Sequence, residues 1–273
     1  MQWTHKLLVF SDVHLTEEDA PIIGLSPSDR FDELLSQALS RHQDASALIL
    51  LGDVAHHGAV DAYERLKAKI SHLPFPVIPM LGNHDNRETF RQVFTDAPSS
   101  LGGFVQHSQE MGDWTLVTLD TLDGPPYPDG QHSGLLCKDR LDWLNAQLEN
   151  AKNRPVLVAA HHHPFLSGLP GMDRINLTNG DELLQALKNH GNCHLICGHI
   201  HRTISGCING VPWAVFKSTC HQAPMDLSSP DTTLSVDEPG GYGVVLLAPD
   251  GAIIHNEEIE RAEVIEDYHS KAD

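Results

Sequence analysis

Short apolar runs recur along roughly the first 200 residues, and most of them are followed by polar residues. Six runs have the length of a buried strand, at 6–10, 47–51, 77–80, 115–119, 156–160 and 194–197. Between them, 60–70, 88–94, 139–151 and 181–190 show patterns typical of helices. Strands that alternate with helices predict an α/β fold in which the strands are buried on both faces.

A further helix is predicted to begin at Ser26. Its side chain can cap the first turn, where Pro27 is also well tolerated. The apolar stripe of this helix consists of Leu34, Leu35, Ala38 and Leu39.

The pattern changes after about residue 200. Segments 203–217 and 242–258 look strand-rich, and Asn209-Gly210 and Asp250-Gly251 are hairpin-turn signals. Stretches 120–134, 164–180 and 224–241 are rich in Pro and Gly and are expected to be loops. Because no internal repeat or linker interrupts the chain, we expect one domain over 1–273. Within it, 222–273 is a candidate cap or dimerisation element of a possible homodimer.

Composition narrows the choice of partners. The chain has 37 Asp and Glu against 18 Lys and Arg, a formal net charge of −19, so nucleic-acid polymers are poor candidate partners. No apolar run approaches the ~18–20 residues that span a bilayer, and the N-terminus lacks a signal-peptide pattern. We therefore expect a cytoplasmic protein with no membrane partner.

Histidine is unusually abundant. The 19 His residues outnumber Lys and Arg combined. Histidine is the commonest metal ligand, and an acidic protein that acts on a small anion needs a local positive centre such as a metal cluster. The clustered positions are His56-His57, His161-His162-His163, and His199 with His201.

Five of the apolar runs end in possible metal ligands. The sequences that follow them are Ser11-Asp12-Val13-His14, Gly52-Asp53, Gly82-Asn83-His84-Asp85, His161-His162-His163-Pro164 and Gly198-His199-Ile200-His201. In open α/β sheets, ligands bind outside the carboxyl ends of the strands, so these side chains are expected at one edge. In an extended chain, residues two apart point the same way, which would let Asp12 and His14 reach one ion. Nitrogen and carboxylate ligands suit zinc, manganese or iron.

In this order, the five motifs resemble those of the calcineurin-like metallophosphoesterases, over about residues 6–201. Within that family, Trp143-Leu144 and segments 218–222 and 239–242 resemble the class III cyclic-nucleotide and glycerophosphodiester phosphodiesterases. The resemblance implies two mixed β-sheets in a sandwich flanked by helices.

The resemblance also implies two metal ions. In the triple His, the family's ligand lies two residues before proline, which selects His162 and leaves His161 and His163 as neighbours without a settled role. The implied ligands are Asp12, His14 and His201 for one ion, Asn83, His162 and His199 for the other, and Asp53 as a bridge between them.

The implied reaction is in-line attack on phosphorus by a hydroxide that bridges the ions. Two divalent ions, two carboxylates and the hydroxide leave about one positive charge, which suits a phosphodiester monoanion. His84 is expected to stabilise the transition state or protonate the leaving alkoxide, and Asp85 to orient His84. The expected substrate contacts are Asn83, His84, His163 and His221, although the last two could equally be ordinary packing or loop residues.

The leading hypothesis is a metal-dependent phosphodiesterase that acts on a small diester, either a cyclic nucleotide such as 3′,5′-cyclic AMP or a glycerophosphodiester. The alternative is a phosphomonoesterase, a nucleotide or protein phosphatase, on the same metal core. A dianion would call for extra positive charge, and the motif loops offer little beyond Arg87, Arg174 and Arg202. A nuclease and a non-enzymatic scaffold are weaker alternatives, because the surface is acidic and the ligand set is intact.

Overall fold

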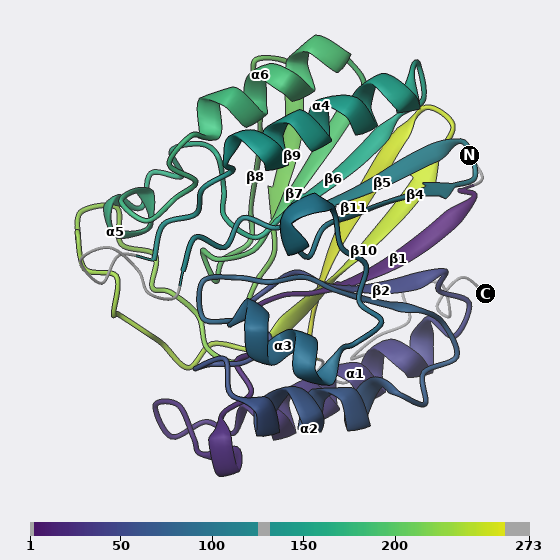
Figure 1. The fold of residues 1–273 in the computed structure, drawn as a ribbon. Coiled ribbons are helices and arrows are strands. Elements are labelled where there is room, and N and C mark those ends of the chain that lie inside the picture. The colour runs from purple at the N-terminus through teal and green to yellow at the C-terminus, as the bar shows by residue number, and fades with distance from the viewer. Residues whose placement is uncertain (1–2, 125–131, 260–273) are drawn as a thin grey trace, which may run out of the picture.

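In the computed structural model, which describes residues 3–124 and 132–259, two β-sheets pack face to face and helices cover their outer faces (Figure 1). Both sheets mix parallel and antiparallel pairs. The predicted sandwich of two mixed sheets flanked by helices is therefore confirmed.

The first sheet has five strands in the order β11-β10-β1-β2-β3. Its central strand, β1, runs parallel to β2, with Leu8 opposite Leu48, and antiparallel to β10, with Lys6 opposite Leu246. The strands are β1 (His5–Phe10), β2 (Ala47–Leu50), β3 (Val77–Pro79), β10 (Gly241–Ala248) and β11 (Gly251–Glu258).

The second sheet has six strands in the order β4-β5-β6-β7-β9-β8. Strands β5, β6, β7 and β9 run parallel, and the edge strands β4 and β8 are antiparallel to their neighbours. The strands are β4 (His107–Met111), β5 (Trp114–Leu119), β6 (Val156–Ala160), β7 (Cys193–Cys197), β8 (Ile204–Ile208) and β9 (Val211–Val215).

The helices divide between the two sheets. Helices α1 (Pro27–Arg41), α2 (Val60–Ile70) and α3 (Arg87–Val93) pack on the first sheet through Phe31, Tyr63 and Phe90, which are fully buried. Helices α4 (Lys138–Ala151) and α6 (Gly180–His190) cover the second sheet, and the short α5 (Pro170–Asp173) lies at one end of the molecule (Figure 1). The chain also forms the 3₁₀ turns η1 (Glu17–Asp19) and η2 (Leu101–Gly103).

A third apolar layer fills the space between the sheets. Val9 and Ile49 from the first sheet pack with Leu116, Ala159 and Ile196 from the second, all fully buried. Such a layer is typical of two sheets packed face to face. It holds the ends of β1, β2, β6 and β7 in fixed relative positions.

Most elements lie where the apolar pattern placed them. Helix α2 has the predicted bounds, and Ser26 caps α1 by accepting a hydrogen bond from the Asp29 N–H at 3.1 Å. Both hairpin turns also form, between β8 and β9 and between β10 and β11. The sequence analysis missed β4 and the short helix α5, which falls in a predicted loop.

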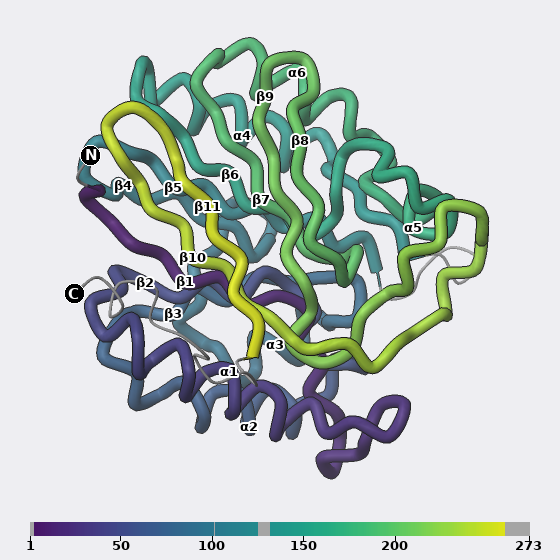
Figure 2. Tube along the Cα trace, turned by 180° about the vertical axis from the view of Figure 1, so that it is seen from behind, coloured from purple at the N-terminus to yellow at the C-terminus, as the bar shows by residue number. Residues whose placement is uncertain are grey.

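The carboxyl-terminal segment 222–273 does not form a separate unit within its described part. Strands β10 and β11 belong to the first sheet, and Figure 2 shows the chain of 222–240 leaving the sheets and passing close to α5 before it returns to β10. Residues 260–273 lie outside the described residues. The proposed cap or dimerisation role stays a prediction.

No helix in the described part of the chain is long and apolar enough to cross a bilayer. The cytoplasmic location stays a prediction.

Candidate metal centre

The predicted metal ligands meet where strands of both sheets end. Strands β1, β2 and β3 bring Asp12, Asp53 and Asn83 from the first sheet, while β6 and β7 bring the His161 loop and His199 from the second. Backbone hydrogen bonds join neighbouring loops, from the Asp12 N–H to the Gly52 carbonyl at 3.1 Å and from the Gly198 N–H to the His161 carbonyl at 3.1 Å. The shared edge of two sheets therefore replaces the single sheet edge used in the sequence argument.

The backbone at these strand ends is left-handed rather than extended. The φ angles of Asp12, His14, Asp53, His199 and His201 are 52°, 53°, 49°, 69° and 52°. Our reasoning that an extended chain aligns Asp12 with His14 was thus wrong, although the two side chains do meet. Left-handed conformations are unfavourable for residues other than glycine and concentrate at functional sites, where surrounding contacts hold them.

One group of donor atoms comprises Asp12, His14, Asp53 and His201. All four are buried, and one ligand atom from each lies within 4.8 Å of the others. The Nε2 of His201 is 3.1 Å from the Nε2 of His14 and 3.2 Å from an Asp12 oxygen. The His14 Nε2 lies 3.8 Å from Asp53 Oδ2.

A second group forms around the Asn83 side-chain oxygen. This oxygen is 2.7 Å from His199 Nδ1 and 3.1 Å from His161 Nε2. The same His161 nitrogen lies 3.3 Å from Asp53 Oδ2, so Asp53 adjoins both groups. The structure therefore places His161 beside the predicted ligands Asn83 and Asp53.

His162 lies in the same cluster of imidazoles but uses both ring nitrogens elsewhere. One ligand atom from each of His161, His162 and His199 lies within 4.8 Å of the others. The Nδ1 of His162 is 2.7 Å from the Thr121 hydroxyl, and its Nε2 is 3.1 Å from the His132 carbonyl. Its assignment as a ligand stays a prediction, and the hydrogen bonds favour His161.

The residues present fit a pair of metal ions. His161 and His201 each place Nδ1 against a backbone carbonyl, of Leu51 at 2.8 Å and of His221 at 2.9 Å. Each carbonyl fixes the proton on Nδ1 and turns Nε2 toward the carboxylates, which is the usual arrangement of metal-binding histidines. Burial lowers the pKa of both imidazoles, but the carboxylates of Asp53 and Asp12 outweigh it and raise the pKa, to about 9 for His161, so a bound metal ion would replace the proton on each Nε2.

Burial keeps further imidazoles neutral. It is the main cause that holds the pKa of His14 and of His199 well below the usual value, and neighbouring imidazoles lower both further. Burial raises the pKa of Asp53, but the nearby His161 and His84 outweigh it and bring that pKa well below its usual value. Neutral imidazoles around ionised carboxylates are the protonation states that cation binding requires.

The structure separates the two predicted catalytic residues. The His84 Nδ1 donates to the His56 carbonyl at 2.8 Å, so this carbonyl orients the imidazole instead of Asp85. Asp85 is buried and accepts hydrogen bonds from backbone N–H groups of 54, 55 and 82 and from the Tyr63 hydroxyl. It joins two metal loops to α2, and burial raises its pKa to about 7.

A cleft of about 750 Å³ opens over the cluster. Among the predicted substrate contacts, Asn83, His84 and His221 line it. His163 does not belong to this lining; it is fully buried, with its Nε2 3.7 Å from Asp173 Oδ1. Substrate contact by these four residues stays a prediction.

Two cleft residues were not predicted as substrate contacts: His132, which the sequence analysis did not single out, and His56, which it named only as part of the clustered pair His56-His57. His132 stacks on His84 with ring centroids 5.4 Å apart, and His56 also stacks on His84, at 4.9 Å. Neither belongs to a motif with ligand spacing. The only signal for His132 was its place in 120–134, a stretch expected to be a loop.

Fold and cluster together define a metal-dependent hydrolase of phosphoesters. The model of the calcineurin-like phosphoesterase family matches residues 5–203, and the chain belongs to this family. A probable cyclic nucleotide phosphodiesterase of Rhodopseudomonas palustris is 36% identical over 253 residues, covering 92% of this chain and 91% of that protein. Its similarity to this relative supports phosphodiesterase activity for the chain.

The chain is also similar to a second phosphodiesterase in sequence and to a phosphatase in fold. The 3′,5′-cyclic adenosine monophosphate phosphodiesterase CpdA of Pseudomonas aeruginosa is 30% identical over 250 residues, covering 90% of this chain and 87% of that protein. In fold, the chain resembles a dimetal phosphatase from Danio rerio with a TM-score of 0.71, at 16% identity and covering 95% of this chain and 98% of that one.

Proposed function

We propose that the protein hydrolyses a phosphodiester bond of a cyclic nucleotide, such as 3′,5′-cyclic AMP, at a dinuclear metal centre. The observation that carries this proposal is the convergence of Asp12, Asp53 and Asn83 with buried imidazoles from five strand ends. The names of the relatives favour a cyclic nucleotide over a glycerophosphodiester and over a phosphomonoester.

The proposed ligand groups follow the distances. Asp12, His14 and His201 hold one ion, while Asn83, His199 and His161 hold the other, and Asp53 contacts both groups. His162 packs beside the second group and is held by hydrogen bonds with the Thr121 hydroxyl and the 132 carbonyl. When bound, the ions supply positive charge for the phosphate and lower the pKa of water so that it becomes a nucleophile.

His84 provides the proton for the leaving oxygen in this proposal. Its Nδ1–H is held by the His56 carbonyl, and its ring lines the cleft beside Asn83, so the imidazolium form would give its Nε2 proton to the leaving oxygen and become neutral imidazole. The stacked rings of His56 and His132 hold the imidazole plane in place. A positioned imidazole of this kind is a suitable general acid.

A substrate panel tests the function. Metal-loaded protein is expected to hydrolyse 3′,5′-cyclic AMP and bis(p-nitrophenyl) phosphate, and to act on p-nitrophenyl phosphate at least about tenfold more slowly in kcat/KM, because the cluster charge matches a monoanion. A preference for the monoester would contradict the proposal and support the phosphatase alternative.

Metal content tests the choice between two neighbouring histidines. His161→Ala is expected to lose about one of the two ions per chain in elemental analysis, whereas His162→Ala keeps most of its metal, because His162 acts through hydrogen bonds. Both variants are compared by circular dichroism to confirm folding. The reverse pattern would restore His162 as the ligand.

A further inference from the structure

The outer part of the cleft is apolar, unlike its floor. Ile22 and Ile23, from the turn before α1, line it together with Met172 and Ile175 near α5 and Leu234 from the segment 222–240. Ile23 is 54% exposed and Leu234 is 42% exposed. Large exposed apolar side chains gathered at the mouth of a polar site indicate a binding surface for an apolar part of the ligand.

Ile23 is held in a conformation that isoleucine rarely adopts. Its φ is 46°, a real outlier for a β-branched residue. The turn is closed by two backbone hydrogen bonds between Ile22 and Leu25, at 2.9 and 2.8 Å. These hydrogen bonds hold the strained geometry, and strained residues that present a side chain into a cleft concentrate at functional sites.

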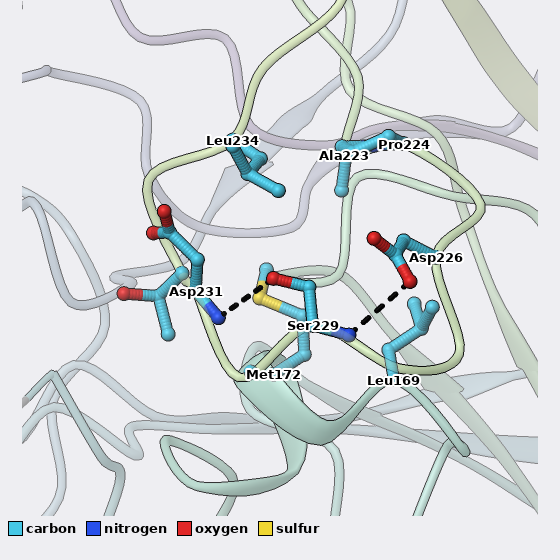
Figure 3. Close-up of a pocket in the computed structure, with 10 residues that line it drawn as sticks. Leu169, Met172, Ala223, Pro224, Asp226, Ser229, Asp231 and Leu234 are labelled. Carbon is cyan, nitrogen blue, oxygen red and sulfur yellow. Dashed lines mark hydrogen bonds between the residues drawn. The ribbon is translucent and has the colours of Figure 1, made fainter.

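The part of the cleft wall that carries Leu234 is also well fixed. Residues 222 and 236 pair at the base of the segment through backbone hydrogen bonds of 3.1 and 2.8 Å. Figure 3 shows Asp226, Ser229 and Asp231 bonding to one another along the segment, with Leu234 and Met172 on the same small cavity. The wall that carries Leu234 therefore has a defined shape before any ligand arrives.

Arg174 adds a cation to this wall. It is the one arginine in the cleft lining among the described residues, and within that part of the chain its guanidinium forms no hydrogen bond or ion pair. Its charge adds to the Thr233 hydrogen bonds that lower the pKa of the exposed Asp231 carboxyl. The other two arginines noted in the sequence are engaged, Arg87 with Asp120 at 2.8 Å and Arg202 with the Ala223 carbonyl and Glu238. Arg174 follows α5 and directly precedes Ile175, whose carbonyl lies 3.0 Å from His199 Nε2.

We propose that this outer part of the cleft is a nucleobase site, in which the base lies between Ile22-Ile23 and Leu234 with the Arg174 guanidinium against its face. This inference rests on the proposed function, because a nucleobase is expected beside the metal cluster only if the substrate is a nucleotide. A purine has the shape and chemistry for the site: a flat apolar face for the aliphatic side chains and π-electrons for a guanidinium. The cleft volume of about 750 Å³ is within the range of small-ligand sites.

Binding of adenosine, which carries the base without the phosphate, tests the proposed nucleobase site directly. Equilibrium dialysis of the metal-loaded protein is expected to show adenosine binding at least about tenfold tighter than ribose, since base stacking contributes to adenosine alone. The double variant Ile23→Ser/Leu234→Ser should lose about tenfold in adenosine affinity. Leu166→Ser, at a residue that is 74% exposed and outside the cleft lining, is the matched control and should bind adenosine as the wild type does.

The Arg174 contact has its own test. Arg174→Lys keeps the charge but loses the planar group, so it should weaken adenosine binding nearly as much as Arg174→Ala. For cyclic AMP, both changes should raise KM more than they lower kcat, because the base lies away from the reacting atoms. Full rescue by lysine, or a loss confined to kcat, would assign Arg174 to the phosphate and overturn its place at the base.

The two proposals fail in different ways. Equal affinity of wild type and Ile23→Ser/Leu234→Ser for adenosine, or no preference of the wild type for adenosine over ribose, would overturn the nucleobase site even if cyclic AMP is hydrolysed. Failure of the metal-loaded wild type to hydrolyse any diester would refute the proposed function, whatever the adenosine result.

Discussion

At the scale of single residues, the site depends on space as much as on ligands. A methyl group on Gly82 would collide with Asp53 Oδ1 and His161 Nε2, which belong to two of the proposed metal ligands. Gly82, between β3 and Asn83, is therefore required because the Asp53 and His161 side chains lie too close to its Cα for a methyl group, and not because of backbone flexibility.

Gly82→Ala is expected to lower kcat/KM for a diester by about 100-fold or more, because a displacement of about 1 Å at a catalytic site can cost that much. Metal content should fall in parallel. Gly103→Ala is the control, since a methyl group there meets nothing within 4 Å although φ is 80°. It should lose about 1 kcal/mol of stability and keep full activity. Normal kinetics for Gly82→Ala would contradict the close approach.

His84→Ala should lower kcat by about 10²- to 10⁴-fold, the usual contribution of a general acid. Elemental analysis should find unchanged metal, because His84 belongs to neither proposed ligand group. A variant that loses metal together with activity would instead make His84 a ligand.

The sequence predicted which residues belong to the metal site better than it predicted which atoms they contact. The metal-type residues stood out because each follows an apolar strand, and most of them do converge. The choice within His161-His162-His163 could not be made from spacing, because it depends on which ring nitrogens find backbone acceptors as β6 ends. His132 had no sequence signal, since it reaches the cleft only through the path of its loop.

At the scale of elements, the apolar pattern was reliable for buried strands and failed at an edge. Strand β4 reads His-Ser-Gln-Glu-Met and is mostly half-buried, so it has no apolar run to detect; only pairing with β5 makes it a strand. Helix α5 is four residues long, too short to show a helical period. Both depend on tertiary contacts rather than on local sequence.

Asp173, at the end of α5, fixes the preceding loop. Its carboxylate accepts hydrogen bonds from the Ser167 N–H and hydroxyl and from the Gly168 N–H. Partial burial raises its pKa, but His163 and these hydrogen bonds outweigh it and bring the pKa to about 2. The carboxylate therefore stabilises the fold at neutral pH, and this contribution is lost as the pH falls from about 4 toward 2.

Asp173→Asn should therefore unfold in urea with about 1–2 kcal/mol less stability at pH 7, from the weakened hydrogen bonds. The difference from wild type should shrink as the pH approaches 2. A difference that stays constant with pH would mean that the carboxylate charge is not what holds the loop.

At the scale of the whole molecule, metal binding and folding should be linked. The buried cluster holds two carboxylates, whose charge the proposed metal ions would balance, and several imidazoles that would bind the same ions. Ligands that bind only the folded state stabilise it by mass action, by about 2.7 kcal/mol at 100 times Kd.

Dialysis against a chelator should thus lower Tm by several degrees, and added manganese, iron or zinc should restore it. Asn83→Ala should show a smaller restoration than wild type, because one group lacks a ligand. An unchanged Tm through removal and reloading would argue against metal at this site.

The cluster draws its ligands from two sheets that meet across an apolar layer, and this has a mechanical consequence. Any slippage of one sheet against the other changes the distance between Asp12 Oδ1 and His161 Nε2, which is 3.9 Å. Ions bound as proposed would bridge the two sheets, so the catalytic rate would depend on how the sheets are aligned. A substitution deep in the apolar layer could then abolish activity without changing any residue of the active centre.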